Sequence, residues 1–448
     1  MKSPQIEFQW KRFQRHFTRF TWGGAWASSL PADTRRNLTL FFYDGFYAAV
    51  SDRIILTYLT IYLLSLGATR QQIGLLSSFS NFAAAFLLLP AALWVERTGK
   101  RKQTTVASIS GSRVVIVLMA VLPFLMKNLS GLIWIILGLA LFREVLNNIA
   151  YPAWISLSGD LVPIEGRGRF FGTRNFIMGI AGIFTALLVG EAITLIGEPL
   201  GYQIAFLFSA GFGTLALVYF ARIKDPQTNF QPQETLTKGL KAIWTSLKAH
   251  PHFISFCIFT ALWNFSLNIL APFISVYMVD TLHFTAAMIG VITVTNTTTN
   301  MLIQRRIGAW ADQWGNRKVH IIFLFLIPII PIFWGLWVQQ YWQAIAIEAF
   351  AGICWGAFTL TSFNYLLMQT PEKQRARFSA YYQIVVTLAL AGGAGLGSFL
   401  IAFIDFSGVA VISSIGRFIA GILFLLIVRD VIQRDDEKQK ENQTGLSS

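Results

Sequence analysis

The chain alternates between long apolar stretches and short polar or basic segments. A helix needs roughly 20 apolar residues to cross a hydrocarbon core of about 30 Å. Stretches of about that length, each followed by polar or basic residues, occupy residues 41–64, 73–94, 106–125, 132–151, 170–194, 202–221, 253–279, 286–310, 320–338, 342–366, 380–404 and 408–428. The pattern predicts an all-α integral membrane protein with twelve transmembrane helices.

A polar segment divides these helices into two sets of six. Residues 222–252 contain three prolines and five Lys or Arg residues, a composition typical of a linker with a surface helix. We therefore expect an N-terminal tail (1–37), a first six-helix bundle (38–221), the linker (222–252), a second six-helix bundle (253–428) and a C-terminal tail (429–448).

Basic residues lie almost entirely on one side of the predicted membrane. Thirty of the 36 Lys and Arg residues fall in the tails, the linker, the segments after even-numbered helices and the helix ends beside those segments, whereas Arg70 and Lys127 fall on the other side. The positive-inside rule then predicts that both termini and the linker are cytoplasmic. The formal net charge of +14 is explained by this topology and by attraction to anionic lipids, and nucleic acid is not an expected partner. Residues 8–20 interleave aromatic and basic side chains, as in an amphipathic helix on a membrane surface.

Composition agrees with a membrane protein and narrows the function. Hydrophobic residues make up 54% of the chain and charged residues 13%, against about a quarter charged residues in soluble domains. The two cysteines, Cys257 and Cys354, lie inside apolar stretches, and no cluster of His or Cys offers a metal site. The chain has no GxxxxGK[ST] loop for ATP. We expect no enzyme activity, no cofactor and no bound metal.

Two pairs of loop segments repeat between the halves. Residues 91–101, "AALWVERTGKR", resemble residues 307–317, "IGAWADQWGNR", and Glu96 in the first segment corresponds to Asp312 in the second. Residues 163–170, "PIEGRGRF", resemble residues 371–378, "PEKQRARF", without a gap. The spacing predicts two homologous six-helix halves, a repeat found in many transporters.

With these loops the chain resembles the major facilitator superfamily. The superfamily's loop signature after the second helix runs Gly, three residues, Asp, Arg, one residue, Gly, Arg and then Arg or Lys. The matching positions here are Ala92, Glu96, Arg97, Gly99, Lys100 and Arg101, and in the second copy Gly308, Asp312, Gly315 and Arg317, with Gln313 where a basic residue is usual. The resemblance implies transport by alternating access, with these loops latching the halves together on the cytoplasmic side. The alternative is that the loop residues only end a helix and enforce topology.

Six charged residues lie deep inside the predicted helices, where a charge is costly unless it is paired or lines an aqueous cavity. These are Asp52, Arg53, Arg113, Arg143, Glu144 and Arg417, while Asp44 and Glu348 lie nearer the membrane edges. The resemblance implies that the first, fourth, seventh and tenth helices line the central cavity. Because adjacent residues point about 100° apart on a helix, we expect pairs between helices: Asp52 with Arg143 or Arg113, and Glu144 with Arg53 or Arg113.

These charges suggest roles in coupling and recognition. Glu144 is the first candidate for proton coupling and Asp52 the second, because intramembrane carboxylates are functional candidates by default. The alternative is a permanently ionised structural ion pair. Arg53, Arg113 and Arg143 could receive an anionic substrate by bidentate hydrogen bonding, unless the nearby acids already satisfy them.

The second half is polar without many charges. Asn264 and Asn268 share a helix face, and Trp355 offers an aromatic surface, so these three residues are candidates for substrate binding. Asn in a membrane helix can equally bond a neighbouring helix. Residues 293–300, "TVTNTTTN", either line an aqueous path or bond back to their own helix. Glycine-rich residues 390–398 favour close helix packing.

These observations together favour a secondary active transporter in the inner membrane of a bacterium. It would move a small organic solute, with protons as the coupling ion and membrane lipids, anionic on the cytoplasmic side, as its other partners. Two alternatives stay open, a passive uniporter and a non-transporting receptor or assembly factor of the same fold. The fifth predicted helix has no Gly-Pro pair, a departure from the superfamily's antiporter signature that weakens a drug-efflux interpretation.

Overall fold

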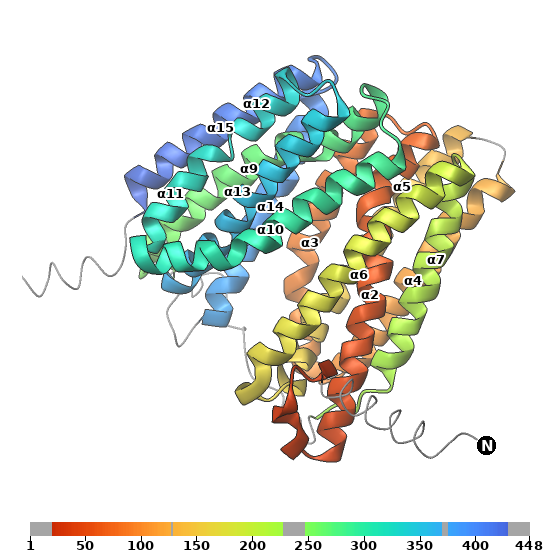
Figure 1. The fold of residues 1–448 in the computed structure, drawn as a ribbon, viewed down its shortest axis with the longest axis vertical. Helices are drawn as coiled ribbons and strands as arrows, with labels where there is room; N and C mark the ends of the chain where they lie inside the picture. Colours follow the sequence, from red (N-terminus) through yellow and green to blue (C-terminus); the bar gives the residue numbers. More distant parts are fainter. Residues whose placement is uncertain (1–19, 127–128, 227–246, 370–374, 429–448) are drawn as a thin grey trace, which may run out of the picture. The chain divides into compact units, whose positions relative to one another are not determined.

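The computed structural model describes residues 20–126, 129–226, 247–369 and 375–428. All regular structure in these ranges is helical. The elements are η1 (Ala25–Ser29), α2 (Ala32–Ser65), α3 (Arg70–Thr98), α4 (Arg101–Leu125), α5 (Leu129–Leu161), η2 (Ile164–Gly166), α6 (Arg167–Ile196), α7 (Leu200–Ala221), α9 (Pro251–Asp280), α10 (Ala286–Trp314), α11 (Asn316–Leu326), α12 (Ile329–Leu336), α13 (Tyr341–Gln369), α14 (Arg375–Leu400) and α15 (Phe406–Ile427). They are drawn in Figure 1.

Within the described ranges, twelve segments are long and apolar enough to cross a membrane, which confirms the predicted fold class. Their edges differ from the predicted ones. α2 begins at Ala32, ahead of the predicted start at Phe41. The ninth span is broken into α11 and α12 at Pro328, because proline has no N–H to donate within a helix. The surface helix expected in the linker, most of the N-terminal tail and the C-terminal tail lie outside the described residues.

The chain divides into two compact units, and two of the boundaries between them fall inside helices, in α3 and α10. Unit 1 contains residues 1–68, 86–233 and 285–290, and unit 2 contains residues 69–85, 234–284 and 291–448. Each unit thus takes in one helix segment from the other half of the sequence. In unit 2, for example, the hydroxyl of Ser78 donates to the carbonyl of Ala391 at 2.8 Å, and the hydroxyl of Ser398 donates to the carbonyl of Gln71 at 2.8 Å.

Unit 1 is built around α2, which packs against α6 and α7, while α4 packs against α5 and α7. The hydroxyl of Tyr62 in α2 donates to the carbonyl of Met119 in α4 at 2.7 Å, a buried bond between helices. A buried hydrophobic cluster near the start of α2 includes Trp22, Phe41, Phe170 and Phe220. The segment before α2 thereby becomes part of the unit.

Unit 2 is built around α9, which packs against α14 and α15. Gly393 and Gly397 of α14 lie against the backbone carbonyls of Phe265 and Ile269 of α9, so closely that a Cβ at either position would collide with them. The glycine-rich stretch therefore permits close packing of two helices, as the sequence indicated. His320 of α11 is buried nearby among aromatic rings.

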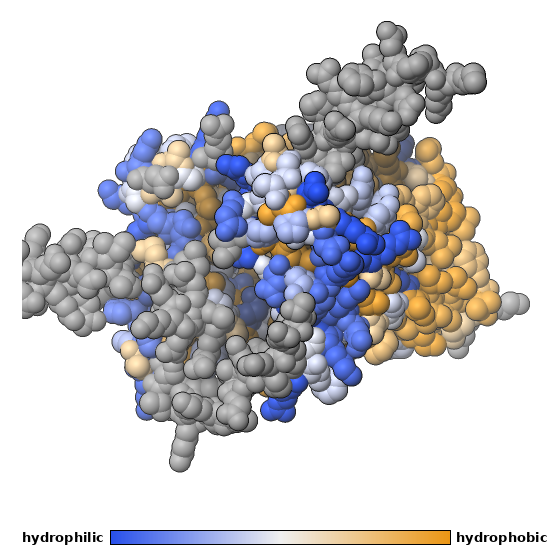
Figure 2. Space-filling view, turned by 90° about the horizontal axis from the view of Figure 1, so that it is seen from below, coloured by the Kyte–Doolittle hydropathy of each residue, from blue (hydrophilic) through white to orange (hydrophobic). Residues whose placement is uncertain are grey.

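Large apolar side chains remain exposed on the outer faces of the helices. Examples are Trp134 on α5, Phe208 on α7 and Phe124 on α4, which are 62%, 59% and 60% exposed. Figure 2 shows hydrophobic side chains gathered along one flank of the face in view, beside a region rich in hydrophilic side chains. A helix that is apolar on both its inner and outer faces is suited to lipid rather than to water.

Candidate functional site

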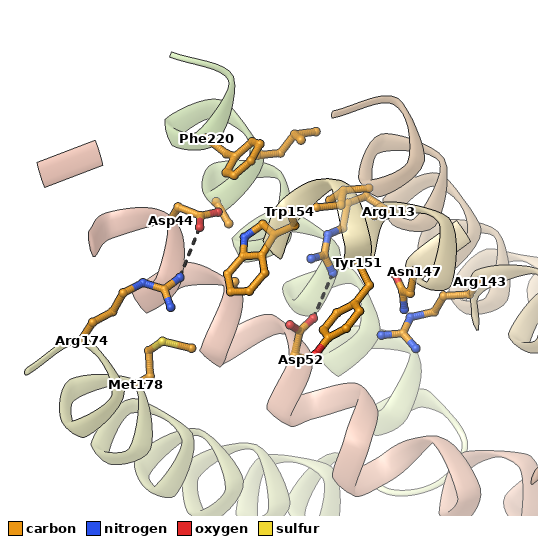
Figure 3. Close-up of a pocket in the computed structure, with 15 residues that line it drawn as sticks. Asp44, Asp52, Arg113, Arg143, Asn147, Tyr151, Trp154, Arg174, Met178 and Phe220 are labelled. Atoms are coloured by element: carbon orange, nitrogen blue, oxygen red, sulfur yellow. Dashed lines mark hydrogen bonds and ion pairs between the residues drawn. The ribbon is translucent and has the colours of Figure 1, made fainter. Parts of the chain in front are cut away.

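A charged cavity of about 370 Å³ lies inside unit 1. Five helices contribute to its lining: α2, α4, α5, α6 and α7. The lining residues are Asp44, Ala48, Asp52, Ile109, Arg113, Arg143, Asn147, Ala150, Tyr151, Trp154, Arg174, Met178, Ala216, Leu217 and Phe220. Figure 3 shows the labelled side chains pointing toward a common space, with charged groups distributed around it.

Helical spacing explains how the sequence places these side chains. Asp44, Ala48 and Asp52 recur every four residues along α2 and therefore share one face. Arg143 and Asn147 of α5 follow the same rule. The polar positions of α2 and of α5 thus form a stripe along each helix, and both stripes line the cavity.

Two ion pairs join helices across the cavity. Nη2 of Arg174 in α6 lies 3.4 Å from Oδ2 of Asp44 in α2, and both side chains are buried. Nη1 of Arg113 in α4 lies 3.5 Å from Oδ1 of Asp52, and it also donates to the hydroxyl of Ser51 at 2.9 Å. Figure 3 marks both pairs with dashed lines. The Asp52–Arg113 pair is one of the two pairings predicted for Asp52.

Glycines on facing helices make room for the arginines. Gly45 of α2 lies against the guanidinium of Arg174, and Gly213 of α7 lies against that of Arg113. A Cβ at either glycine would collide with the guanidinium group. The side chain of Arg174 also donates from Nε to the carbonyl of Phe41 at 3.1 Å and stacks on the Phe41 ring at 4.3 Å.

The other charged residues predicted for this unit, Glu144 and Arg53, have different neighbours from those expected. Nη1 of Arg143 pairs with Oε1 of Glu144, the next residue along α5. The expected pairing of Glu144 with another helix is therefore wrong, because the long arginine side chain bends back far enough to overcome the divergence of adjacent Cβ atoms. Arg53 lies against Gly182 of α6, and neither it nor Glu144 is among the residues that line the cavity. Their predicted functional roles stay predictions.

Several cavity residues were missed in the sequence. The sequence pattern places Asp44 nearer the membrane edge and does not single out Arg174, which lies buried inside α6. Asn147, Tyr151 and Trp154 carry no charge and were not singled out. The four-residue spacing of polar positions in α2 and α5 is the signal that could have found most of them.

The candidate substrate residues of unit 2 contact backbone carbonyls and an aromatic ring of the protein itself. The amide of Asn264 donates to the carbonyl of Thr260 one turn earlier at 2.9 Å, and that of Asn268 donates to the carbonyl of Leu390 in α14 at 2.7 Å. Trp355 lies edge to face with Phe358 at 5.7 Å between ring centroids. The Asn268 bond matches the alternative of helix-to-helix bonding, and the proposed substrate contacts of all three residues stay predictions.

Three of the five threonines in residues 293–300 bond back to their own helix, the second of the two predicted behaviours. The hydroxyls of Thr295, Thr297 and Thr299 each donate to the carbonyl four residues earlier, at 2.9 Å. Asn296 instead donates to the carboxylate of Glu348 in α13 at 2.7 Å, and Nε1 of Trp334 donates to the same carboxylate at 3.0 Å.

Comparison with known proteins decides the family. A family model described as Major Facilitator Superfamily matches residues 45–271 and 255–448. The chain belongs to the Major Facilitator Superfamily. Multidrug resistance protein MdtG of Serratia proteamaculans is 22% identical over 393 residues, which cover 85% of this chain and 91% of that protein. A multi-drug resistance efflux pump PmrA homolog of Lactococcus lactis is 23% identical over 398 residues, which cover 85% of this chain and 92% of that protein.

Solved transporter structures share the superfamily fold. A bacterial homologue of the iron transporter ferroportin, in an inward-facing state, has a TM-score of 0.70 at 14% identity and covers 88% of this chain and 98% of its own. The nucleoside transporter NupG has a TM-score of 0.62 at 14% identity, with coverages of 88% and 99%. At such identities the likeness shows the fold and nothing about the substrate.

The first copy of the superfamily's loop is anchored by one buried arginine. Gly99 has φ of +65°, a left-handed conformation that suits glycine and ends α3. Arg101 then begins α4, and its guanidinium contacts Asp160 at the end of α5 at 2.5 Å and Asp225 beyond α7 at 2.6 Å. Arg97 is exposed, and the side chain of Glu96 lies outside what the structure describes.

The second copy repeats this arrangement in unit 2. Gly315 has φ of +87°, and Arg317 donates from Nη1 to the carbonyl of Val428, just after α15, at 2.6 Å. Gly308 lies within α10 in open space, and the side chain of Asp312 is outside the described part. In both copies the arginine ties its helix to the end of the last helix of its own unit, which gives each loop a local structural role. The predicted latch between halves stays a prediction.

Proposed function

We propose that this protein is a proton-coupled secondary transporter that moves a small organic solute by alternating access, and that the cavity of unit 1 is its solute site. The observation that carries the proposal is the cavity itself, where Asp44, Asp52, Arg113, Arg143 and Arg174 surround about 370 Å³ of space within membrane-spanning helices. Charges at that depth are costly and mark ion or substrate paths.

Asp52 and Glu144 are the proposed proton-coupling groups. The side chain of Asp52 is 58% exposed, whereas that of its partner Arg113 is 11% exposed, so protons and solutes in the cavity can reach the carboxylate. Glu144 is 35% exposed and pairs with Arg143, which does line the cavity. This arrangement supports Asp52 as the more direct candidate and Glu144 as a second group acting through Arg143.

The membrane orientation and the substrate range complete the proposal. The distribution of Lys and Arg supports cytoplasmic termini in a bacterial inner membrane, with anionic lipids at the cytoplasmic surface. Several relatives are named for multidrug resistance, and these names make amphipathic drugs a suitable part of the first substrate panel. Export of such compounds is a second candidate function supported by that similarity.

Transport in sealed proteoliposomes tests the proposal. The vesicles would contain a pH-sensitive dye, and a panel of metabolites and amphipathic drugs would be added outside to the native protein, Asp52→Asn and Glu144→Gln. Asp33→Asn is the matched control, because Asp33 is an exposed acid at the start of the same helix and pairs with Lys224 outside the cavity. We expect a solute-dependent pH change that is lost in Asp52→Asn and kept in the control.

The other outcomes point to the alternatives. Solute flux without any pH change in the native protein would indicate a uniporter. Binding of a solute without flux would indicate a receptor of the same fold and would refute transport.

A further inference from the structure

Two of the five charged side chains around the cavity, Arg174 and Asp44, are paired with each other. Arg174 stacks on Phe41, donates to a backbone carbonyl and pairs with Asp44, and both charged groups are buried. A charge that is fixed and paired in this way offers little to a ligand. Recognition of a solute therefore depends on Asp52, Arg113 and Arg143.

Arg113 has unused hydrogen-bonding capacity. A guanidinium carries five N–H donors, but the contacts of Arg113 in the described structure involve only Nη1, which reaches Ser51 at 2.9 Å and Asp52 at 3.5 Å. Its Nε is buried and has no hydrogen-bond partner among the described residues. At 3.5 Å the contact with Asp52 is longer than a charge-assisted bond of about 2.7–2.9 Å. The Arg174–Asp44 contact is also long, at 3.4 Å, but Arg174 donates in addition from Nε to the carbonyl of Phe41, whereas Nε of Arg113 donates to no described residue.

Arg143 is in a similar condition. Its Nη1 donates to the neighbouring Glu144, and its buried Nε has no partner within the described ranges. Both arginines line the cavity, and Arg113 lies within electrostatic range of Arg143. Asp52 and Glu144 each contact one of them through Nη1, so an anionic group placed near both guanidinium groups would further offset their repulsion. A carboxylate or phosphonate can accept two parallel bonds from a guanidinium, which a cation or a neutral solute cannot do as strongly.

We propose that the cavity selects an organic anion whose carboxylate or phosphonate group replaces Asp52 at Arg113 and also interacts with Arg143. This inference rests on the proposed function, because it names the substrate class of the same cavity. The rest of the lining includes Tyr151, Trp154 and Phe220, which suit an apolar or aromatic body attached to the anionic group.

The same geometry makes Asp52 an internal competitor of the solute. Neutralising Asp52 frees Arg113, so protonation of Asp52 and binding of the anion favour each other, and by linkage each raises the affinity for the other. Proton and anion would then cross together, as in a symporter. The charged and titratable groups that line the cavity around Asp52 are Asp44 of α2, Arg113 of α4, Arg143 and Tyr151 of α5, and Arg174 of α6.

Direct binding to the purified full chain in detergent micelles, measured by calorimetry, tests the inference separately from transport. The probes are two matched sets that share a ring and differ in charge: benzoate, benzylamine and benzyl alcohol, and naphthoate, naphthylmethylamine and naphthylmethanol. Benzylphosphonate is added so that a phosphonate is tested beside the carboxylates. The variants are Asp52→Asn, Arg113→Gln and the control Asp33→Asn, which removes the same charge from the same helix outside the cavity.

We expect anions to bind in preference to their amine and alcohol counterparts. Asp52→Asn should bind the anion about tenfold more tightly, and Arg113→Gln at least about tenfold more weakly, since one charge-assisted contact is gained or lost. Asp33→Asn should match the native protein. A gain in Asp52→Asn cannot come from misfolding, so this variant keeps the test sound even if Arg113→Gln is unstable.

Three results would overturn the anion site: preferential binding of the amines or alcohols, failure of every anion to bind, or weaker anion binding in Asp52→Asn. The outcomes also separate the two proposals. Anion binding without flux in proteoliposomes would leave the anion site standing and refute transport. Flux of cationic or neutral solutes without anion binding would support transport and refute the anion site.

Discussion

Arg101 should contribute to stability far more than its neighbour Arg97, although both belong to the same loop signature. The side chain of Arg101 is 3% exposed and contacts two carboxylates from different parts of unit 1. Arg97 is exposed. Substituting each by Gln removes one positive charge from the same loop, so the pair separates the effect of buried contacts from that of net charge.

The size of the difference follows from the exposure of the two acids. A hydrogen bond to a charged group contributes about 1.5–3 kcal/mol, but Asp160 is 57% exposed and water replaces most of its contact in the variant. Asp225 is 26% exposed and accepts bonds from both Nε and Nη2 of Arg101. Loss of these contacts therefore accounts for most of the expected destabilisation. We expect Arg101→Gln to lower the free energy of unfolding by about 2–3 kcal/mol, against about 0.5 kcal/mol or less for Arg97→Gln.

Unfolding of the purified variants in mixed micelles, followed by circular dichroism, measures this difference. Asp225→Asn should lower the free energy of unfolding more than Asp160→Asn, for the same reason of exposure. Equal losses in Arg101→Gln and Arg97→Gln would refute the argument, because they would show that the charge of the loop matters and its buried contacts do not.

Three smaller predictions follow from single positions, each measured as a change in the free energy of unfolding. Gly315→Ala should cost about 1–2 kcal/mol, because φ is +87° there. Gly308→Ala should be neutral or stabilising by up to about 1 kcal/mol, because a Cβ at this position in α10 would meet no other part of the protein within 4 Å. Destabilisation by both substitutions would contradict this prediction. Gly393→Ala should cost about 1–3 kcal/mol because its Cβ meets a backbone carbonyl, and Gly392→Ala, which meets only a ring at 3.2 Å, should cost less. Trp334→Phe should cost about 1.5–3 kcal/mol by removing a donor from the carboxylate in α13, and an unchanged stability would show that water replaces the indole.

Hydrophobic patterning was sufficient to predict the fold. Long apolar stretches have few alternatives in a membrane, because backbone groups in lipid must bond within their own helix. The misplaced edges have simple reasons. α2 continues through the polar residues before Phe41 because a helix does not end where its apolar character ends, and the ninth span breaks because Pro328 cannot donate.

The site was harder to predict than the fold. Asp52, Arg113 and Arg143 were identified by depth alone, since a charge in an apolar stretch is conspicuous. Which residues pair could not be read in the same way, because a guanidinium lies several bonds from its backbone and can bend toward a neighbour, as Arg143 does toward Glu144. The partners of such groups depend on the rotation of each helix, and one sequence does not specify that rotation.

The two units keep the same loop architecture but differ in how they treat buried charge. In unit 1 the carboxylates of Asp44 and Asp52 face guanidinium groups around a cavity. In unit 2 the carboxylate of Glu348 accepts bonds from neutral donors, and Arg417 donates to the carbonyl of Leu267 and the hydroxyl of Ser413. Ion pairs between helices can be exchanged for a proton or a charged solute, whereas bonds from fixed neutral groups mainly hold helices in place. This difference between the units supports the proposal that unit 1 carries ion coupling and charge recognition. The proposal predicts that neutralising Asp52 alters transport more than neutralising Glu348 does.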